Sequence, residues 1–554
     1  PGITQERFLY LKKLHMDNFS GGMKTMYLVN TCDKEENFYL YENGELKKQK
    51  GYVCFYERNY EMQEYMLERR ERKPIESPEK DKVMKSIRSI IQEKEEMRQR
   101  RKNSVFLYGI SSFMAVVVLV IGINLLNSYE KMKKFDHSLL KDPRYFSDGR
   151  MDAHSDHTYY RCEEEREDGK TSFRHSLNGL WKFHYARNYA SAIPGFEEEA
   201  YSCKDWEDIY VPAHIQMEGY DAPQYANVQY PWEGHEELHP GQIPERFNPV
   251  ASYVRYFHVP ESMKGKRVFV SFQGAESGLA LWLNGKFVGY SEDSFTPSEF
   301  ELTEYLKEGE NKLAAQVFKW TASSWCEDQD FFRFSGIYRD VYLYTVPEVH
   351  VYDLKIRAIP DETLKKASLE IVTKTWGKGK LKLILSRKGE ILLQDEKALD
   401  GEDTCTWEIL NPLLWSAEEP NLYDLDMEVY DENGMLQEII PEKVGFRRFE
   451  MKDGIMTLNG KRIVFKGVNR HEFSSVTGRH VSREELIQDI VTMKQNNINA
   501  IRTCHYPDAS PIYRLCDEYG LYMIAENNLE SHGSWDVAEL TGDYTDIVPH
   551  NKPE

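Results

Sequence analysis

The amino-acid sequence predicts a multidomain, mostly β protein that ends in the first part of a (β/α)8 barrel and carries one transmembrane helix. Three observations predict this fold class. Short apolar runs of alternating pattern fill much of residues 127–444, strands and helices alternate from residue 445, and residues 105–126 contain no charged side chain. The 554 residues are enough for several domains, at ~100–200 residues each.

The composition excludes several broad classes of protein. Hydrophobic residues make up 41% and charged residues 29%, a balance that excludes collagen-like, wholly disordered and polytopic membrane proteins. The formal net charge of −20 argues against nucleic acid as a partner, because nucleic-acid binders usually present a basic face. The eight cysteines are scattered without a CxxC spacing, so we expect isolated, reduced thiols.

Residues 1–104 form an N-terminal region to which the sequence assigns no function. Residues 37–56 have the pattern of short strands around an Asn43-Gly44 turn, which suits a hairpin. Residues 77–103 are densely charged, with apolar residues at helical spacing, and predict an exposed amphipathic helix.

Residues 105–126 predict a transmembrane helix, because a bilayer core needs ~20 apolar residues in a helix. A cleaved signal peptide fits poorly, since it would lie at the N-terminus, and a buried core helix is the main alternative. Basic residues flank the segment on both sides and only weakly favour the N-terminal side in the cytoplasm.

Residues 127–345 predict one β domain and residues 346–444 a second. In the first, apolar runs at 268–272, 280–283, 286–288 and 313–318 are typical of a sandwich or barrel, with Asn284-Gly285 as a hairpin turn. In the second, strands at 367–372, 381–385 and 422–429 within ~100 residues suit an immunoglobulin-like β-sandwich.

Residues 445–554 predict parallel βα units. Strands are expected at 463–465, 500–503 and 522–525, with helices at 482–497 and from Ser510 to the stop at Gly520. Ser482 and Glu485 have the spacing of a capping box. A (β/α)8 barrel needs ~250 residues, so the sequence predicts a truncated barrel.

Polar residues follow each of these strands, where βα barrels place their function. Glu530 and His532 are two residues apart, so an extended chain would point both side chains to one face and could hold Mg²⁺ or Mn²⁺. A surface glutamate beside a structural histidine is the alternative, because the spacing is common by chance. His471 and His505 could each donate a hydrogen bond to a substrate hydroxyl or to developing charge, although a lone histidine is more often structural.

Many separate motifs give the chain a specific resemblance to a known family. It resembles glycoside hydrolase family 2 β-galactosidases over about three quarters of its length, from residue 132 onward. The strings that carry the resemblance are GVNRHE (467–472), MKQNNINAIRTCHYP (493–507), CDEYGLY (516–522), NNLESHG (527–533), EDQDFFRFSGIYRDV (327–341), YANVQYP (225–231), VPAHIQMEGY (211–220), NGKFVGYSEDSFTPSEFEL (284–302), PLLWSAEEPNLY (412–423) and VGFRRFE (444–450).

The resemblance implies domains and residue roles. Residues 127–345 would be a jelly-roll-like, galactose-binding domain, 346–444 the immunoglobulin-like domain and 445–554 the start of the TIM-barrel catalytic domain. It implies that Asn227 and Asp330 contact galactose hydroxyls and that Asp330 also binds Na⁺. The other roles it implies are sugar binding and transition-state stabilisation for His471 and His505, and Mg²⁺ ligation for Glu530 and His532. A turn or cap role is the alternative for Asp330, and a turn role for Asn227.

The activity that the resemblance implies is retaining hydrolysis of terminal β-D-galactose from β-galactosides such as lactose. Retention requires two carboxylates ~5–5.5 Å apart. In the family these glutamates come from the fourth and seventh barrel strands, which this sequence does not reach, and Glu472 and Glu526 do not match them. We therefore expect the isolated chain to be inactive and its barrel portion to be unstable.

Three alternatives remain at the level of sequence. The first is a β-glucuronidase of the same family, although no basic residue for the sugar carboxylate is evident. The second is a non-catalytic, membrane-anchored carbohydrate-binding protein, and the third makes residues 1–131 a membrane regulator joined to a passenger hydrolase. Localisation is cytoplasmic if the hydrolase is a separate protein and single-pass membrane if residues 105–126 belong to it. Homo-oligomers are common among such enzymes.

Overall fold

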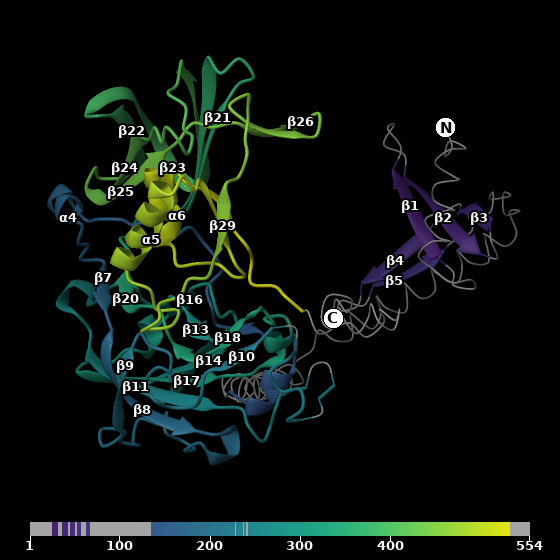
Figure 1. Ribbon diagram of the computed structural model, residues 1–554, viewed down its shortest axis with the longest axis vertical. Helices are drawn as coiled ribbons and strands as arrows, with labels where there is room; N and C mark the ends of the chain where they lie inside the picture. Colours follow the sequence, from purple (N-terminus) through teal and green to yellow (C-terminus); the bar gives the residue numbers. More distant parts are fainter. Residues whose placement is uncertain are drawn as a thin grey trace, which may run out of the picture. The chain divides into compact units, whose positions relative to one another are not determined.

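The computed structural model describes residues 135–531, apart from 228, 237, 240 and 241, together with the backbone of five strands between residues 25 and 66. The chain forms two compact units, Pro1–Gly122 and Ile123–Glu554 (Figure 1). In the first unit, β1 (Thr25–Asn30), β2 (Glu36–Glu42) and β3 (Glu45–Gln49) form an antiparallel sheet, and β4 (Tyr52–Tyr56) pairs with β5 (Met62–Met66). The antiparallel pairing of β2 with β3 agrees with the predicted hairpin.

The predicted transmembrane helix requires a correction to the fold class. No helix in the described part of the chain is long and apolar enough to cross a membrane. Residues 105–126, on which the prediction rested, lie outside the described residues, as does the amphipathic helix expected at 77–103. The uncharged run satisfies the length requirement for a bilayer, but a spanning helix is not found among the described residues.

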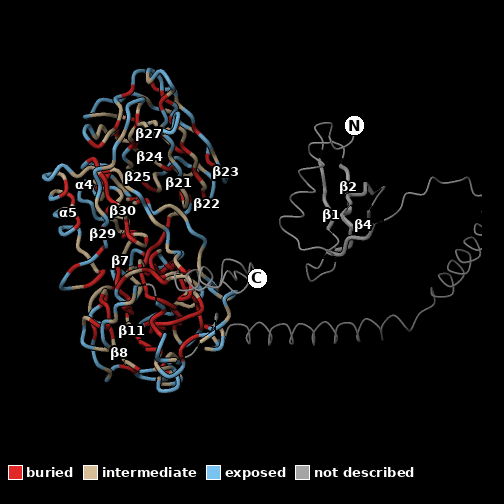
Figure 2. Tube along the Cα trace, turned by 45° about the vertical axis from the view of Figure 1, so that its right-hand side comes forward, coloured by how far each residue is buried: buried red, intermediate tan, exposed pale blue. Residues whose placement is uncertain are grey.

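The second unit begins with a β-sandwich, as predicted. A seven-stranded sheet of order β6-β15-β14-β17-β11-β8-β9 packs on a four-stranded sheet of order β16-β12-β20-β7. Trp181, Tyr253 and Phe272 are among the buried side chains between the two sheets, and Figure 2 shows the mainly buried trace around β11. The strands are β6 (Ser147–Asp148), β7 (Arg174–Ser176), β8 (Gly179–Ala186), β9 (Glu207–Val211), β11 (Val250–His258), β12 (Val268–Phe272), β14 (Gly278–Leu283), β15 (Lys286–Ser291), β16 (Ser298–Glu301), β17 (Glu310–Phe318) and β20 (Val341–Thr345).

Short elements decorate this sandwich. Two antiparallel ribbons pair β10 (Gln224–Ala226) with β18 (Phe331–Arg333) and β13 (Ala275–Glu276) with β19 (Gly336–Ile337). The predicted hairpin turn is confirmed between β14 and β15, where Asn284 and Gly285 have φ values of 53° and 82°. The short helices are α4 (Glu163–Asp168) and 3-10 turns at His137–Lys141, Tyr189–Ser191, Glu261–Met263, Thr303–Tyr305 and Ala322–Trp325.

The second β domain is a five-stranded antiparallel sheet whose long strands bend over one core. Its strands are β21 (His350–Pro360), β22 (Lys366–Arg387), β23 (Glu390–Leu410), β24 (Tyr423–Asp431) and β25 (Leu436–Val444). The runs predicted as separate strands at 367–372 and 381–385 are two halves of β22. The pairing of β22 with β23 shifts between Lys374 and Lys378, so the strand turns there, and Leu369 and Leu383 of the two halves enter the same core.

The barrel portion starts with a small antiparallel sheet of β26 (Phe449–Lys452), β27 (Ile455–Leu458) and β28 (Lys461–Arg462). The parallel sheet of β29 (Gly467–Arg470), β30 (Ala500–Thr503) and β31 (Tyr522–Ile524) follows, with α5 (Arg483–Gln495) and α6 (Pro511–Tyr519) as crossovers. Both helices pack on one face of this sheet. The predicted βα alternation is confirmed, including the capping box of Ser482 with Glu485.

The first parallel strand was predicted at 463–465 and this position is wrong. The backbone N–H of Ile463 donates to Met456, which extends the preceding antiparallel hairpin. Pairing with β30 begins at Gly467, whose partner is Ala500. A Cβ at position 467 would lie 3.1 Å from the Ala500 carbonyl oxygen, so a glycine suits this close approach.

Candidate active site

Three strand ends bring polar side chains to one rim of the parallel sheet. Arg470 of β29 pairs with Thr503 of β30, and Arg502 of β30 pairs with Ile524 of β31. The residues directly after these strands therefore emerge side by side, which is where parallel βα proteins gather their functional groups. His471 directly follows β29, and His505 and Glu526 stand two residues after the ends of β30 and β31.

His505 is held by two charged neighbours. Its Nδ1 lies 3.2 Å from Oε2 of Glu526 and 3.3 Å from an Nη of Arg502. Arg502 also forms an ion pair with Glu526, and the backbone N–H of Glu526 donates to the Thr503 hydroxyl at 2.9 Å. These contacts fix the ring and leave the far edge of His505 directed away from the Arg502–Glu526 pair.

His471 stands next to His505, with ring centroids 5.5 Å apart and planes at 82°. Its Nδ1 is 3.5 Å from the hydroxyl of Tyr506, a buried residue stacked on Phe295. Partial burial, followed by the neighbouring His505 and the positive charge of Arg479, lowers the pKa of His471. His471 is therefore a neutral imidazole at neutral pH, a form that donates from one nitrogen and accepts at the other.

Asn227 and Asp330 lie at the end of the β10–β18 ribbon. Ala226 pairs with Phe331, so Asn227 directly follows one strand where Asp330 directly precedes the other. The hydroxyl of Tyr225 donates to the carboxylate of Asp330. The structure thus brings the two predicted sugar ligands to one place, and it adds Tyr225, which the sequence analysis did not single out. Its position two residues before Asn227 on a strand was the available signal, because such residues share a face.

The loop that carries Asp330 is hydrogen-bonded to the segment that carries Glu530. The Asp328 N–H donates to the Glu530 carbonyl at 2.9 Å, and the Glu530 N–H donates to the Cys326 carbonyl at 2.6 Å. Gln329 donates to the Asn528 side chain at 2.8 Å, and Asn528 in turn donates to Glu327. The β-sandwich and the third barrel strand are therefore joined beside the site.

Two buried arginines also join the β-sandwich to the barrel portion. Arg479 pairs with Glu276, donates to the Phe332 carbonyl at 2.9 Å, and lies 4.5 Å from the centroid of the Phe331 ring. Arg339 pairs with Glu472 at 2.7 Å.

The two glutamates that could be mistaken for catalytic groups are already engaged. Glu472 binds Arg339 and accepts a hydrogen bond from the Ala509 N–H at 2.9 Å, while Glu526 binds Arg502. Both carboxylates are therefore ion-paired with arginines, and their exclusion from catalysis stays a prediction.

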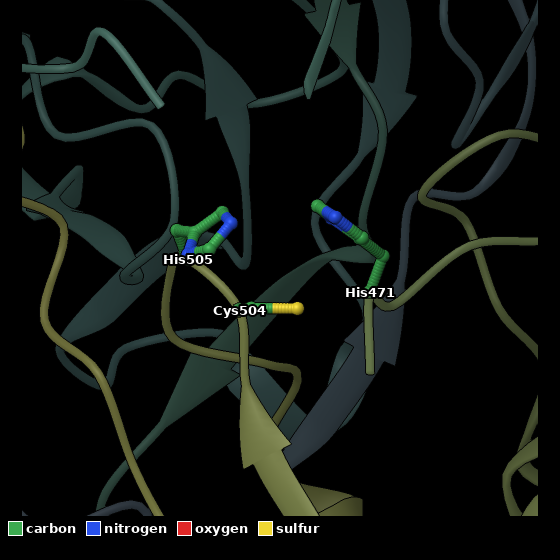
Figure 3. A group of neighbouring side chains, drawn as sticks. All are labelled: His471, Cys504 and His505. Atoms are coloured by element: carbon green, nitrogen blue, oxygen red, sulfur yellow. The ribbon is translucent and has the colours of Figure 1, made fainter. Parts of the chain in front are cut away.

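The predicted metal ligands are only partly within the described residues. Glu530 is half-buried at the loop after β31, whereas His532 lies outside the described residues. Near the histidines, a cluster of different chemistry appears: ligand atoms of His471, Cys504 and His505 all lie within 4.8 Å of one another (Figure 3). The sequence analysis treated Cys504 as an isolated thiol, because its proximity to His471 depends on pairing across the sheet.

Profiles of one family match most of the described chain. They are the glycosyl hydrolases family 2 sugar binding domain over residues 174–347, the glycosyl hydrolases family 2 domain over 349–447, and the glycosyl hydrolases family 2 TIM barrel domain over 449–553.

Curated relatives carry matching names. A β-galactosidase of Halalkalibacterium halodurans is 52% identical over 413 residues, which cover 72% of this chain and 40% of that protein. A β-galactosidase of Streptococcus thermophilus is 48% identical, with 77% of this chain and 42% of that protein covered. A β-galactosidase large subunit of Lactobacillus acidophilus is 40% identical, with 75% and 69% covered. The chain thus spans about two fifths of the first two relatives and about two thirds of the third.

Solved structures agree with the fold. A β-glycosidase from Bacteroides vulgatus superposes with a TM-score of 0.53 at 26% identity, covering 69% of this chain and 49% of that one. A β-glucuronidase from Bifidobacterium dentium superposes with a TM-score of 0.54 at 20% identity, covering 68% and 67%. At that identity the second likeness shows the fold alone.

Proposed function

We propose that this chain, which belongs to glycosyl hydrolases family 2, forms the galactose-recognising part of a retaining β-galactosidase. The observation that carries the proposal is the meeting of two sets of polar groups. Asp330, with Tyr225 bound to it, comes from the β-sandwich, and His471 and His505 come from the barrel rim. Burial, His505 and Arg479 lower the pKa of His471, and Asp330 is a weaker opposing influence, so its carboxylate lies within electrostatic reach of the ring. Curated relatives at 40–52% identity are named β-galactosidases or large subunits of them, which supports the same substrate.

Each group in this arrangement suits a sugar ring. Carboxylate and amide oxygens of Asp330 and Asn227 would accept hydrogen bonds from hydroxyl groups, and charged acceptors form the stronger bonds. The two imidazoles would donate to sugar oxygens and to the charge that develops as the glycosidic bond breaks. Retention also needs a carboxylate nucleophile and a carboxylic acid. Three parallel strands lie within the described residues, and we propose that the two carboxylates come from barrel strands beyond them.

We propose Mg²⁺ as the resident cation, with Mn²⁺ as an alternative, and Na⁺ at Asp330. Glu530 supplies a carboxylate oxygen, the ligand type that Mg²⁺ prefers, and the hydrogen bonds of Glu530 to Cys326 and Asp328 fix its backbone. His532 would be the second protein ligand. When bound, Mg²⁺ would stabilise negative charge near the reacting sugar.

β-Glucuronidase is the second candidate, because solved structures of that name share the fold. An enzyme that binds a glucuronide needs a cationic side chain that is free to pair with the sugar carboxylate. Arg502 contacts His505 and is already paired with Glu526, and Arg470, next to His471 in sequence, is paired with Asp489 and Asp508. An added substrate carboxylate would compete with these pairs, which favours the galactoside.

The test compares a chromogenic β-D-galactoside with the β-D-glucuronide of the same leaving group, on protein that includes the complete barrel. We expect kcat/KM to favour the galactoside by at least about 10²-fold, because an unpaired buried charge costs several kcal/mol. Equal rates, or a preference for the glucuronide, would overturn the assignment. Assembly into oligomers, through identical or different subunits, is part of the proposal, and sedimentation velocity measures it.

A further inference from the structure

One cysteine and two histidines meet at the strand ends. His471 directly follows β29 and Cys504 directly follows β30, and the last pair of these two strands is Arg470 with Thr503. Positions 471 and 504 are therefore neighbours in register, and His505 follows at once. Figure 3 shows the two imidazole rings on either side of Cys504, whose sulfur points toward the side on which His471 lies.

We propose that His471, Cys504 and His505 form a binding site for Zn²⁺, distinct from the Mg²⁺ position proposed at Glu530. Zn²⁺ takes imidazole nitrogen and thiolate sulfur in tetrahedral sites, whereas Mg²⁺ prefers oxygen. A His₂Cys set therefore selects a thiophilic cation against Mg²⁺. Three protein ligands leave the fourth position for water or another small ligand. Coordination replaces the thiol proton of Cys504 by a Zn–S bond, and the proton passes to solvent without electron transfer.

The distances allow the site to close with small movements. Ligand atoms of the three residues lie within 4.8 Å of one another. Zn–N bonds of ~2.0 Å and Zn–S bonds of ~2.3 Å in a tetrahedron place ligand atoms about 3.3–3.6 Å apart. The largest gap must therefore shrink by about 1 Å. Cys504 is 3% exposed, whereas His471 keeps more solvent-accessible surface, so we expect the His471 ring to make the movement.

The carboxylate of Glu526 lies beside one of the proposed ligands, His505. Histidines that bind metals usually donate their other ring N–H to a carboxylate, which fixes the ring and its tautomer. Glu526 Oε2 lies 3.2 Å from Nδ1 of His505, and the backbone N–H of Glu526 donates to the Thr503 hydroxyl. Arg502, at 3.3 Å from the same Nδ1, favours the opposite tautomer. A cation on the Nε2 side would select the bond to Glu526, whose negative charge also offsets that of the cation.

The site has a consequence for the sugar. His471 and His505 are the side chains proposed to contact galactose, so Zn²⁺ and a galactoside would exclude each other. This consequence rests on the proposed function, whereas Zn²⁺ binding itself does not.

Co²⁺ titration of the full chain under reducing conditions tests the proposal, because Co²⁺ replaces Zn²⁺ and a cobalt–thiolate bond gives a near-ultraviolet charge-transfer band. We expect one equivalent of Co²⁺ to produce this band and one equivalent of Zn²⁺ to remove it. Cys504→Ser should abolish the band. Cys162→Ser is the matched control, since Cys162 directly precedes α4 and is not a member of the cluster, and it should retain the band.

A second variant keeps the test informative if Cys504→Ser fails to fold. His471→Gln removes an exposed ring, and we expect Co²⁺ affinity to fall at least about tenfold, the smallest loss usual for altering the surroundings of a metal. Absence of the band in the unmodified chain overturns the proposal, as does a band that persists in Cys504→Ser or an unchanged affinity in His471→Gln. None of these measurements depends on catalysis, so failure of the Zn²⁺ proposal can be distinguished from failure of the proposed function.

Discussion

The Arg479–Glu276 ion pair is predicted to hold the barrel portion against the β-sandwich. The side chains of the two residues are 1% and 6% exposed, so the pair is removed from water. Arg479→Met keeps the length of the side chain but leaves Glu276 as an unpaired buried charge and removes the hydrogen bond to the Phe332 carbonyl. Removing one partner of a buried pair costs about 3–5 kcal/mol.

Hydrogen exchange measured by mass spectrometry on peptides from α5 tests this value. A loss of about 3–5 kcal/mol in opening free energy corresponds to roughly 10²- to 4 × 10³-fold faster exchange, because each 1.4 kcal/mol is about tenfold. The matched control is Arg514→Met. Arg514 is 45% exposed and lies 3.8 Å from both Asp156 and Glu442, so its loss should cost under about 1 kcal/mol.

The double variant Arg479→Met/Glu276→Gln should exchange more slowly than Arg479→Met alone, because the stranded charge is then gone. If Arg479→Met accelerates exchange by less than tenfold, or no more than the Arg514 control, the pair does not hold the barrel portion in place and the reasoning is refuted.

Three further predictions concern the proposed sugar ligands, two histidines that titrate, and the activity of the chain alone. In protein with a complete barrel, Asp330→Asn should lower kcat/KM for a galactoside by about 10²-fold, because hydrogen bonds to charged groups contribute about 1.5–3 kcal/mol. Tyr225→Phe should lower kcat/KM less, and equal effects of the two variants would contradict this prediction. Burial lowers the pKa of His157 to about 3, so the folded state holds this ring in its neutral form. Protonation in the unfolded state therefore costs no stability above pH 6.5, and it lowers the free energy of unfolding by about 2 kcal/mol at pH 5. In urea unfolding, the stability of His157→Gln should therefore fall less on acidification than that of the unmodified protein. The stability of His154→Gln should fall more, because the bond to Glu299 raises the pKa of His154 and stabilises the fold at low pH. Curves of unfolding free energy against pH that run parallel to that of the unmodified protein would refute both predictions. The 554-residue chain alone should not hydrolyse a galactoside above contaminant level, which a chromogenic assay measures.

Local signals in the sequence predicted the parts of the fold that depend on neighbouring residues. Ser482 with Glu485 starts α5, Pro511 starts α6 and Gly520 follows its last residue, as the capping rules require. Asn284 adopts the positive φ that the hairpin turn needs. Each of these features is decided within a few residues, so a single sequence carries the information.

Features that depend on distant partners were not predicted. The apolar run at 463–465 resembles a parallel strand, but the Ile463 N–H is taken by Met456, and only a partner at Ala500 makes Gly467 the first paired residue. The continuity of β22 likewise follows from its ladder with β23. The transmembrane helix was inferred from hydrophobicity and length alone, which say nothing of neighbouring contacts.

In the candidate site, too, some residues were predictable from local motifs and others only from strand pairing. Motif resemblance pointed to His471, His505 and Asp330 one by one, without saying how they meet. Strand pairing is what sets Cys504 beside His471, and it is what places Tyr225 near Asp330. Residues that strand pairing brings together alter the chemistry of the rim, since a thiol among imidazoles attracts metals that carboxylates do not. Single-residue reasoning therefore misses properties that arise where two strands meet, and the Cys504 and Tyr225 variants test two of them.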